Sequence, residues 1–313
     1  MTRKECIIVA GPTAVGKTAE AIRLAKHYHT SIISADSRQC YSELNIGVAR
    51  PSVQELNEVK HYFIANHSIT ENISAASFAK EAREYLVEIF KDHDKAIVCG
   101  GTGLYIKALV EGLDNIPTIP KEIRETVIQL YSENGIDALR KKLLELDPTF
   151  SLHGDINNPQ RMMRGLEVVL HTGSSIYEYH NRERDKGQVT RDKPAQTEVS
   201  GGEYNNNNYN NYNDYNNSTI TFTYKILDLP REELYDRINM RVDKMIEDGL
   251  EDEVRTLTAY KDLPALQTVG YKEFFDYFDG KYSREEAIDK IKQHTRNYAK
   301  RQVTWFKRVA ANS

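Results

Sequence analysis

The chain has 313 residues, of which 40% are hydrophobic and 28% are charged, enough for about two domains with a sizeable core. Its net charge of −4, from 42 basic and 46 acidic side chains, gives no overall indication of nucleic-acid binding. No apolar run approaches the roughly 20 residues of a membrane-spanning helix, and the N-terminal apolar stretch is too short for a signal peptide. We therefore expect a cytoplasmic protein. Its three widely spaced cysteines predict neither a disulfide framework nor a zinc site.

The first motif directly follows a short apolar run at residues 7–10. Gly11-Pro-Thr-Ala-Val-Gly16-Lys17-Thr18 fits the pattern of glycine, four residues, glycine, lysine and threonine. Such a loop turns backbone N–H groups toward an anion, Lys17 adds a positive charge, and the Thr18 hydroxyl can bind Mg²⁺. The alternative is a glycine turn with an incidental lysine. The flanking strand and helix patterns favour a polyphosphate site, without specifying ATP.

Short apolar strands alternate with amphipathic helices over the first hundred residues. The predicted order is strand 7–10, helix 18–29, strand 31–37, helix 75–91 and strand 95–103. This alternation indicates a parallel sheet, whose ligands bind outside the carboxyl ends of the strands. The strand exits at Gly11, Asp36 and Gly100–Thr102 are therefore expected to converge.

The pattern changes after a proline-rich linker that follows residue 113. Helices are predicted at 121–146 and 159–171, and an Asn/Tyr-rich tract within 182–217 predicts a disordered loop. A strand at 218–229 precedes predicted helices at 231–248, 250–260, 272–278 and 284–309. The predicted fold is an α/β, P-loop NTPase-like core of residues 1–114 and 218–313 with C-terminal helices, interrupted by a helical insertion domain at 115–181.

Two polar residues at the strand exits have several possible roles. Asp36 could bind Mg²⁺ through water, act as a base on an acceptor, or cap a helix. Thr102 could be a turn hydroxyl or a hydrogen-bond donor to a ligand. Near the C-terminus, residues 290–308 hold seven basic side chains and no acidic one, with Tyr298 and Trp305 among them. This basic stripe is either a solvated helix face or a surface for nucleic acid.

The chain resembles the bacterial tRNA dimethylallyltransferases, or tRNA isopentenyltransferases. Eight segments match in family order: GPTAVGKT, SADSRQCY, IGVARP, CGGTGLYIKAL, NNPQRMMRGLEV, RINMRVDKMIEDGLEDEV, QTVGYKEF and TRNYAKRQVTWFKR. The resemblance implies transfer of a dimethylallyl group from dimethylallyl diphosphate to the N6 amine of adenosine 37 in tRNAs that read codons beginning with U. It also implies Mg²⁺ as cofactor and an insertion domain that grips the anticodon arm, and we expect a monomer.

The resemblance assigns roles residue by residue. The diphosphate is bound by Gly11, Pro12, Thr13, Ala14, Val15, Gly16, Lys17, Thr18 and Arg241, with Thr18 also a ligand of Mg²⁺. Asp36 is the proton acceptor and, with Thr102 and Lys17, forms the catalytic group. The tRNA contacts are Asp36, Ser37, Arg38, Gln39, Thr102, Arg124, Gln160, Arg161, Met162, Met163, Arg164, Gln267, Thr268, Val269, Gly270, Tyr271 and Lys272.

The chain departs from the family pattern at several places. KHYFIANHSI replaces a His-rich acidic stretch, so His61 and His67 are expected to be core histidines. The Asn/Tyr-rich tract is longer than the usual loop, and the zinc finger of eukaryotic relatives is missing. Two other functions share the phosphate loop: a small-molecule P-loop kinase, and a non-catalytic tRNA-binding regulator.

Overall fold

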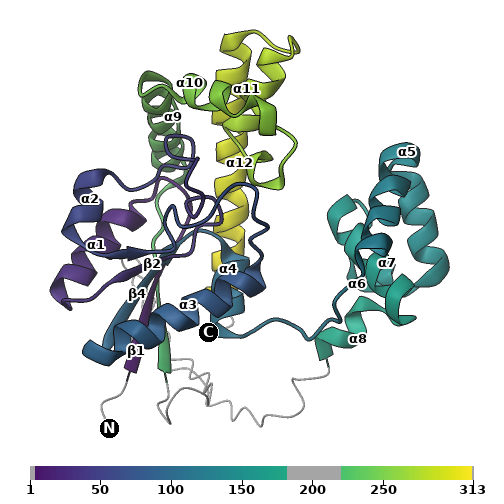
Figure 1. Ribbon diagram of the computed structural model, residues 1–313, viewed down its shortest axis with the longest axis horizontal. Helices are drawn as coiled ribbons and strands as arrows, with labels where there is room; N and C mark the ends of the chain where they lie inside the picture. Colours follow the sequence, from purple (N-terminus) through teal and green to yellow (C-terminus); the bar gives the residue numbers. More distant parts are fainter. Residues whose placement is uncertain (1–3, 182–219, 312–313) are drawn as a thin grey trace. The chain divides into compact units, whose positions relative to one another are not determined.

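The computed structural model describes residues 4–181 and 220–311 (Figure 1). The Asn/Tyr-rich tract and its predicted disorder lie outside the described residues. The described residues form two compact units, one of residues 4–112 with 220–311 and the other of residues 113–181. Within these ranges, no helix is both long and apolar enough to cross a membrane.

The first unit is built on a five-stranded sheet. Its strands are β1 (Lys4–Ala10), β2 (Ile32–Ser34), β3 (His61–Tyr62), β4 (Lys95–Gly100) and β5 (Ile220–Ile226), in the order β3-β2-β4-β1-β5. All four pairings are parallel, with Ile8 opposite Val98 and Val98 opposite Ile33. The predicted parallel α/β sheet is therefore confirmed.

The two faces of the sheet are covered by different helices, because successive side chains of a strand point to opposite faces. Val9, Ile32 and Ile97 pack with α1 (Lys17–His27). The alternate residues of the same strands face α3 (Ala75–Asp92) and α4 (Gly103–Val110). Burial on both faces accounts for the nearly continuous apolar runs of β1 and β4.

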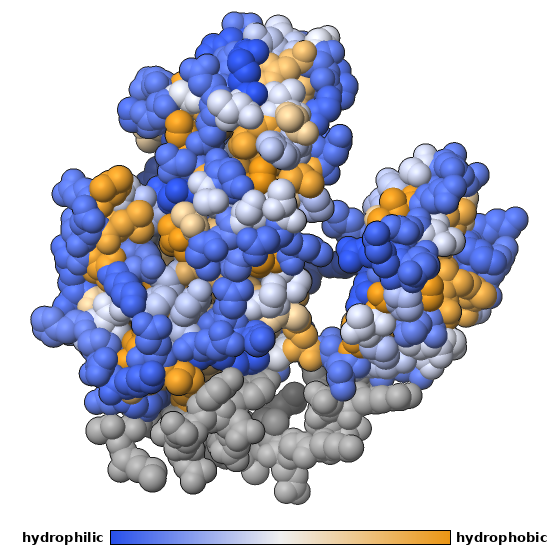
Figure 2. Space-filling view, viewed as in Figure 1, coloured by the Kyte–Doolittle hydropathy of each residue, from blue (hydrophilic) through white to orange (hydrophobic). Residues whose placement is uncertain are grey.

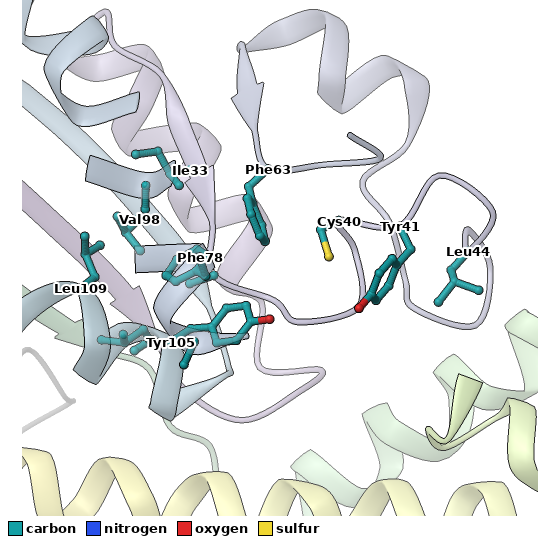
Figure 3. Close-up of a cluster of buried hydrophobic side chains, with 14 of the residues drawn as sticks. Ile33, Cys40, Tyr41, Leu44, Phe63, Phe78, Val98, Tyr105 and Leu109 are labelled. Atoms are coloured by element: carbon teal, nitrogen blue, oxygen red, sulfur yellow. The ribbon is translucent and has the colours of Figure 1, made fainter. Parts of the chain in front are cut away.

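Aromatic rings fill the core between α3, α4 and the segment after β3. Figure 3 shows Phe63, Phe78 and Tyr105 converging there from three segments. The rings of Phe78 and Tyr105 are stacked with centroids 4.4 Å apart, and Phe63 meets Phe78 edge-on at 5.0 Å. This cluster anchors the segment after β3 to the helices that cover the sheet.

The remaining helices of this unit are α2 (Val53–Glu58), α9 (Arg231–Glu247), α10 (Leu250–Thr256), α11 (Tyr271–Phe278) and α12 (Arg284–Ala311), with 3-10 turns at Thr258–Tyr260 and Pro264–Leu266. Helix α12 begins after a capping box, in which Ser283 and Glu286 each bond the other's backbone N–H. It contacts α4, α9 and α11, and it buries Ile291, Ala299 and Phe306.

The second unit is helical, with α5 (Lys121–Leu146), α6 (Phe150–His153), α7 (Pro159–Thr172) and α8 (Ile176–Asn181). Asn158 caps α7 by accepting from the Arg161 N–H, and Pro159 occupies the first turn. Helices α5 and α7 pack against each other around Leu139, Phe150 and other apolar residues. Figure 2 shows hydrophilic side chains over much of the visible surface of each unit, as expected when apolar stripes face inward.

Candidate active site

The carboxyl ends of β1, β4 and β2 are neighbours in the sheet, so the segments that follow them lie together. The N–H of Thr102, after β4, donates to the carbonyl of Ala35, after β2, at 3.2 Å. The N–H of Ser37 donates to the Thr102 hydroxyl oxygen at 3.1 Å. These bonds bring Thr102 beside the turn that carries Asp36.

The phosphate loop lies between β1 and α1. Gly11 has a φ of 145°, and a Cβ there would lie 2.4 Å from the carbonyl oxygen of Leu227, so only glycine fits. The N–H of Thr13 donates to Oε1 of Gln302 at 2.8 Å. The hydroxyl oxygen of Thr13 accepts from Nη1 of Arg241 at 3.2 Å. Thr13 therefore joins the loop to two distant helices.

Two cations meet at this loop. Nζ of Lys17 donates to the carbonyl of Pro12 at 2.7 Å. The pKa of Lys17 is lowered to about 8, mainly by burial and also by the positive charge of Arg241. Cys99 and Asp36 act in the opposite direction. Burial likewise lowers the pKa of Arg241, while Asp36 raises it. Clustered and partly desolvated cations of this kind suit a ligand that carries several negative charges.

Asp36 is half-buried and has one oxygen engaged. Oδ1 accepts from the N–H groups of Arg38 at 2.9 Å and Gln39 at 3.4 Å, which closes the turn after β2. Oδ2 has no hydrogen-bond partner among the described residues. No helix begins at Asp36, so it is not a helix cap; closure of the turn accounts for one oxygen and leaves the other for a ligand.

The second half of the loop of residues 40–50 is held by two side chains, Gln39 and Glu253. Gln39 donates from Nε2 to the carbonyls of Val48 at 3.3 Å and Ala49 at 3.0 Å. Glu253 of α10 accepts from the N–H groups of Ile46 at 2.7 Å and Gly47 at 3.1 Å. The side chain of Gln39, expected to contact tRNA, is thus engaged with the protein.

The segment 267–272, also expected to contact tRNA, is partly buried. Tyr271 is fully buried, and its hydroxyl donates to Glu253 at 2.5 Å. Gly270 is buried, Thr268 and Val269 are half-buried, and Gln267 donates to the carbonyl of Lys261 at 2.7 Å. Gln267 and Lys272 expose their side chains, so they present this segment to solvent.

The expected tRNA contacts of the helical unit differ in exposure. Gln160, Arg161 and Arg124 are exposed, and Met163 and Arg164 are half-buried, whereas Met162 is fully buried in the core of the unit. Met162 can therefore support α7 but does not present its side chain to a ligand. Nη1 of Arg164 lies 3.0 Å from Oε2 of the buried Glu167, and Nε of Arg124 lies 3.9 Å from Oε1.

Only some of the basic side chains in the stripe of α12 are available to a ligand. Nζ of Lys292 lies 2.6 Å from Asp243, and Nη1 of Arg296 donates to Asn239 at 2.7 Å, which ties α12 to α9. Lys300, Lys307 and Arg308 are exposed. The stripe thus divides into charges that hold two helices together and charges that face solvent.

His61 and His67 are both partly buried, with polar partners. Nδ1 of His61 lies 2.8 Å from the carbonyl oxygen of Val59. The two ring nitrogens of His67 lie 2.9 Å from Glu71 and 3.1 Å from Glu81. His67 is therefore a structural residue held by two carboxylates.

Two residues of α12 near the site were not predicted. Gln302 is buried and bonds the phosphate loop. The pKa of Tyr298 is raised to about 12, mainly by burial and also by the negative charge of Asp36. A hydrogen bond with the Thr102 side chain acts in the opposite direction. The sequence offered one signal for Gln302. It lies three residues after Ala299 and four before Phe306, so it is a polar residue on the apolar, buried face of the helix.

The residues present fit a divalent cation that is bound together with a phosphate. Mg²⁺ prefers oxygen ligands, keeps several waters, and often binds through one or two protein oxygens plus substrate phosphates. Thr18, in the first turn of α1, and Asp36 supply such oxygens. No cluster of three or more His, Cys, Asp or Glu side chains suited to a metal occurs in the described ranges.

Comparison with known proteins identifies the family of the chain. The family model described as IPP transferase matches residues 39–309. The tRNA dimethylallyltransferase of Cytophaga hutchinsonii is 41% identical over 307 residues, covering 98% of this chain and 91% of that protein. That of Christiangramia forsetii is 43% identical over 302 residues, covering 96% and 90%.

Solved structures show the same fold. The full-length tRNA isopentenylpyrophosphate transferase of Bacillus halodurans has a TM-score of 0.61 and 31% identity, covering 97% of this chain and 87% of that chain. A eukaryotic dimethylallyltransferase acting on tRNA has a TM-score of 0.68 and 25% identity, covering 96% and 69%. The predicted P-loop-like α/β fold is thus the fold of these relatives, and the chain belongs to the IPP transferase family, the tRNA dimethylallyltransferases.

Proposed function

We propose that this protein transfers a dimethylallyl group from dimethylallyl diphosphate to N6 of adenosine 37 in tRNAs that read codons beginning with U. One observation carries the proposal. Asp36, with one oxygen unengaged within the described residues, lies beside a phosphate loop that holds two cations, Lys17 and Arg241, in a chain of this family. The site therefore combines a group that can take a proton with charges that can hold a leaving diphosphate.

The donor half of the reaction is bond breaking. The bond between the allylic C1 and the diphosphate oxygen breaks, and its electron pair leaves with the diphosphate. Lys17, Arg241 and the backbone N–H groups of the loop stabilise the negative charge that grows on this leaving group. Preorganised electrostatic stabilisation of this kind usually contributes more to catalysis than any other single effect.

The acceptor half is formation of a bond from N6 to C1. The exocyclic amine is a weak nucleophile, because its lone pair is delocalised into the purine. Asp36 takes the N6 proton through Oδ2 as the bond forms, and Thr102, held by the Ser37 N–H, orients the amine. The products are N6-isopentenyladenosine in tRNA, diphosphate and a proton.

Mg²⁺ would be held by Thr18 and the diphosphate oxygens, and Asp36 could bind it through water. When bound, it would neutralise part of the charge on the leaving diphosphate. Lys17, Arg241 and the backbone N–H groups of the phosphate loop bind and orient the diphosphate.

The tRNA would be bound through its phosphates as well as its target base. Arg161 and Arg124 are exposed on the helical unit, and Lys300 and Lys307 are exposed on α12. The target adenosine must leave its stack to reach Asp36, which costs a few kcal/mol, and phosphate contacts would offset that cost. We further propose that the protein acts as a monomer in the cytoplasm.

The products distinguish this function from the two alternatives. The wild-type chain, incubated with dimethylallyl diphosphate, Mg²⁺ and unmodified tRNA, should release one diphosphate per modified tRNA and should not consume ATP. Release of ADP in step with turnover would indicate a kinase. Binding of tRNA without release of diphosphate would indicate a regulator.

A further inference from the structure

A buried glutamine of α12 joins the two loops of the candidate active site. Gln302 is 6% exposed, its Oε1 accepts from the Thr13 N–H at 2.8 Å, and its Nε2 donates to the carbonyl of Gly101 at 2.9 Å. Thr13 belongs to the phosphate loop after β1, and Gly101 directly precedes Thr102 after β4. One side-chain amide thus satisfies one backbone group from each loop.

The approach of α12 to these loops is close. A Cβ at Gly101 would lie 2.1 Å from Nε2 of Gln302, and one at Gly103 would lie 2.2 Å from Nε1 of Trp305. Gln302 and Trp305 are three residues apart and so share a face of the helix. The absence of side chains at residues 101 and 103 therefore lets α12 touch the backbone of the loop that carries Thr102.

The amide has a role that an apolar side chain of the same size could not fill. Buried polar groups are kept where they have partners, and here both ends of the amide have one. The remaining core-facing residues of α12 near it, Ala299 and Phe306, are apolar. Packing alone would be served by a residue such as methionine, whereas the amide of glutamine also supplies an acceptor to one loop and a donor to the other.

We propose that Gln302 is a positioning residue that sets the separation between the prenyl donor, dimethylallyl diphosphate, and the amine that accepts the dimethylallyl group. The inference rests on the proposed function, in which the phosphate loop holds the diphosphate while Asp36 and Thr102 hold the amine. Reacting atoms must be held about 3–3.5 Å apart, and a displacement of about 1 Å can cost about 10²-fold in rate. Gln302 fixes one loop relative to the other, so it acts on the rate rather than on either affinity.

The test replaces Gln302 with methionine in the full chain, which keeps the volume and removes both hydrogen bonds. Gln293→Met is the matched control, because Gln293 is exposed on the same helix. The single-turnover rate is measured at saturating donor and tRNA, alongside affinities for inorganic diphosphate and tRNA, and the Tm. We expect Gln302→Met to lower the rate by about 10- to 100-fold, with both affinities within about threefold of wild type.

Gln302→Asn covers the case in which the methionine variant does not fold. Asparagine keeps the amide without adding charge, but it is one carbon shorter and cannot bond both loops at their present separation, so its rate should also fall while diphosphate still binds. A rate per folded molecule within about twofold of wild type in the folded variants would overturn the positioning role. An inactive wild-type chain would instead overturn the proposed function.

Discussion

Asp36 and Lys17 carry opposite charges at the same edge of the sheet, and we assign them different roles. Asp36 has one oxygen in its own turn and one without a partner in the described part of the chain. Lys17 lies at the start of α1, with a pKa lowered by burial. A single substitution at each position separates proton transfer from diphosphate binding.

Asp36→Asn should leave donor and tRNA affinities near normal and lower the turnover by about 10²–10⁴-fold. Asparagine keeps the size of the side chain and the Oδ1 acceptor for Arg38 and Gln39, but it cannot take a proton. Single-turnover rates and separate binding measurements check this, with the exposed Asp262→Asn as control. Weaker donor binding that excess Mg²⁺ restores would instead mean that Asp36 binds the metal. Unchanged turnover would mean that Asp36 only closes its turn.

The affinity for inorganic diphosphate should fall as the pH rises above about 8, because Lys17 in the ligand-free protein loses its proton near that pH. The sign follows from the charge, since only the protonated amine attracts the anion. Lys17→Ala should bind more weakly below pH 8 and lose this component of the pH dependence. Titration calorimetry across this range measures it, and Lys26→Ala, at the exposed end of α1, should behave as wild type.

His67 should stabilise the fold more at low pH than at high pH. Burial opposes its protonation, but hydrogen bonds with Glu71 and Glu81 prevail and raise its pKa above the ordinary 6.5. A raised pKa stabilises the folded state fully below pH 6.5, and this contribution is lost as the pH rises through the folded value. Urea unfolding of His67→Gln should show the larger deficit below pH 6.5, and a deficit independent of pH would contradict this.

Helix α7 presents two arginines in different settings. Arg161 is exposed, whereas Arg164 is paired with the buried Glu167. Arg161→Ala should weaken tRNA binding, lower its salt slope by about 1, and leave the Tm unchanged. Arg164→Ala should also lower the Tm, because it removes a partner of a buried carboxylate.

Salt-dependent tRNA binding and thermal unfolding of the two variants measure this contrast. Lys141→Ala, exposed on α5, is the control. Equal salt slopes in the wild type and Arg161→Ala would mean that this face of α7 does not meet phosphates.

The elements differ in how far the sequence alone could predict them. Strands β1 and β4 and helices α3, α5 and α12 follow from apolar runs and helical spacing, and each lies within a few residues of its prediction. Strand β3 was not predicted, because two residues, His61 and Tyr62, are too short to show alternation. The kink of α5 at Gly135 was also missed, since a lone glycine in a helical pattern is usually tolerated.

At the scale of the whole molecule, local motifs predicted the site residues that follow the strands. They did not predict the long-range contacts that hold the loops carrying these residues. The phosphate loop, Asp36 and Thr102 each follow a recognisable strand, so a parallel sheet brings them together. Gln302 is 289 residues from Thr13 in the chain, and no local pattern connects the two. The bonds of Glu253 to Ile46 and Gly47 are long-range in the same way.

Mass spectrometry of the anticodon-loop nucleosides tests the proposed transfer most directly. The purified wild-type chain is incubated with dimethylallyl diphosphate, Mg²⁺ and unmodified tRNA, beside Asp36→Asn and a tRNA with guanosine at position 37. We predict N6-isopentenyladenosine at position 37 for the wild type, far less for the variant, and none for the altered tRNA. Unmodified adenosine 37 after incubation with folded wild-type protein, or a dimethylallyl group at another position, would contradict the proposed transfer.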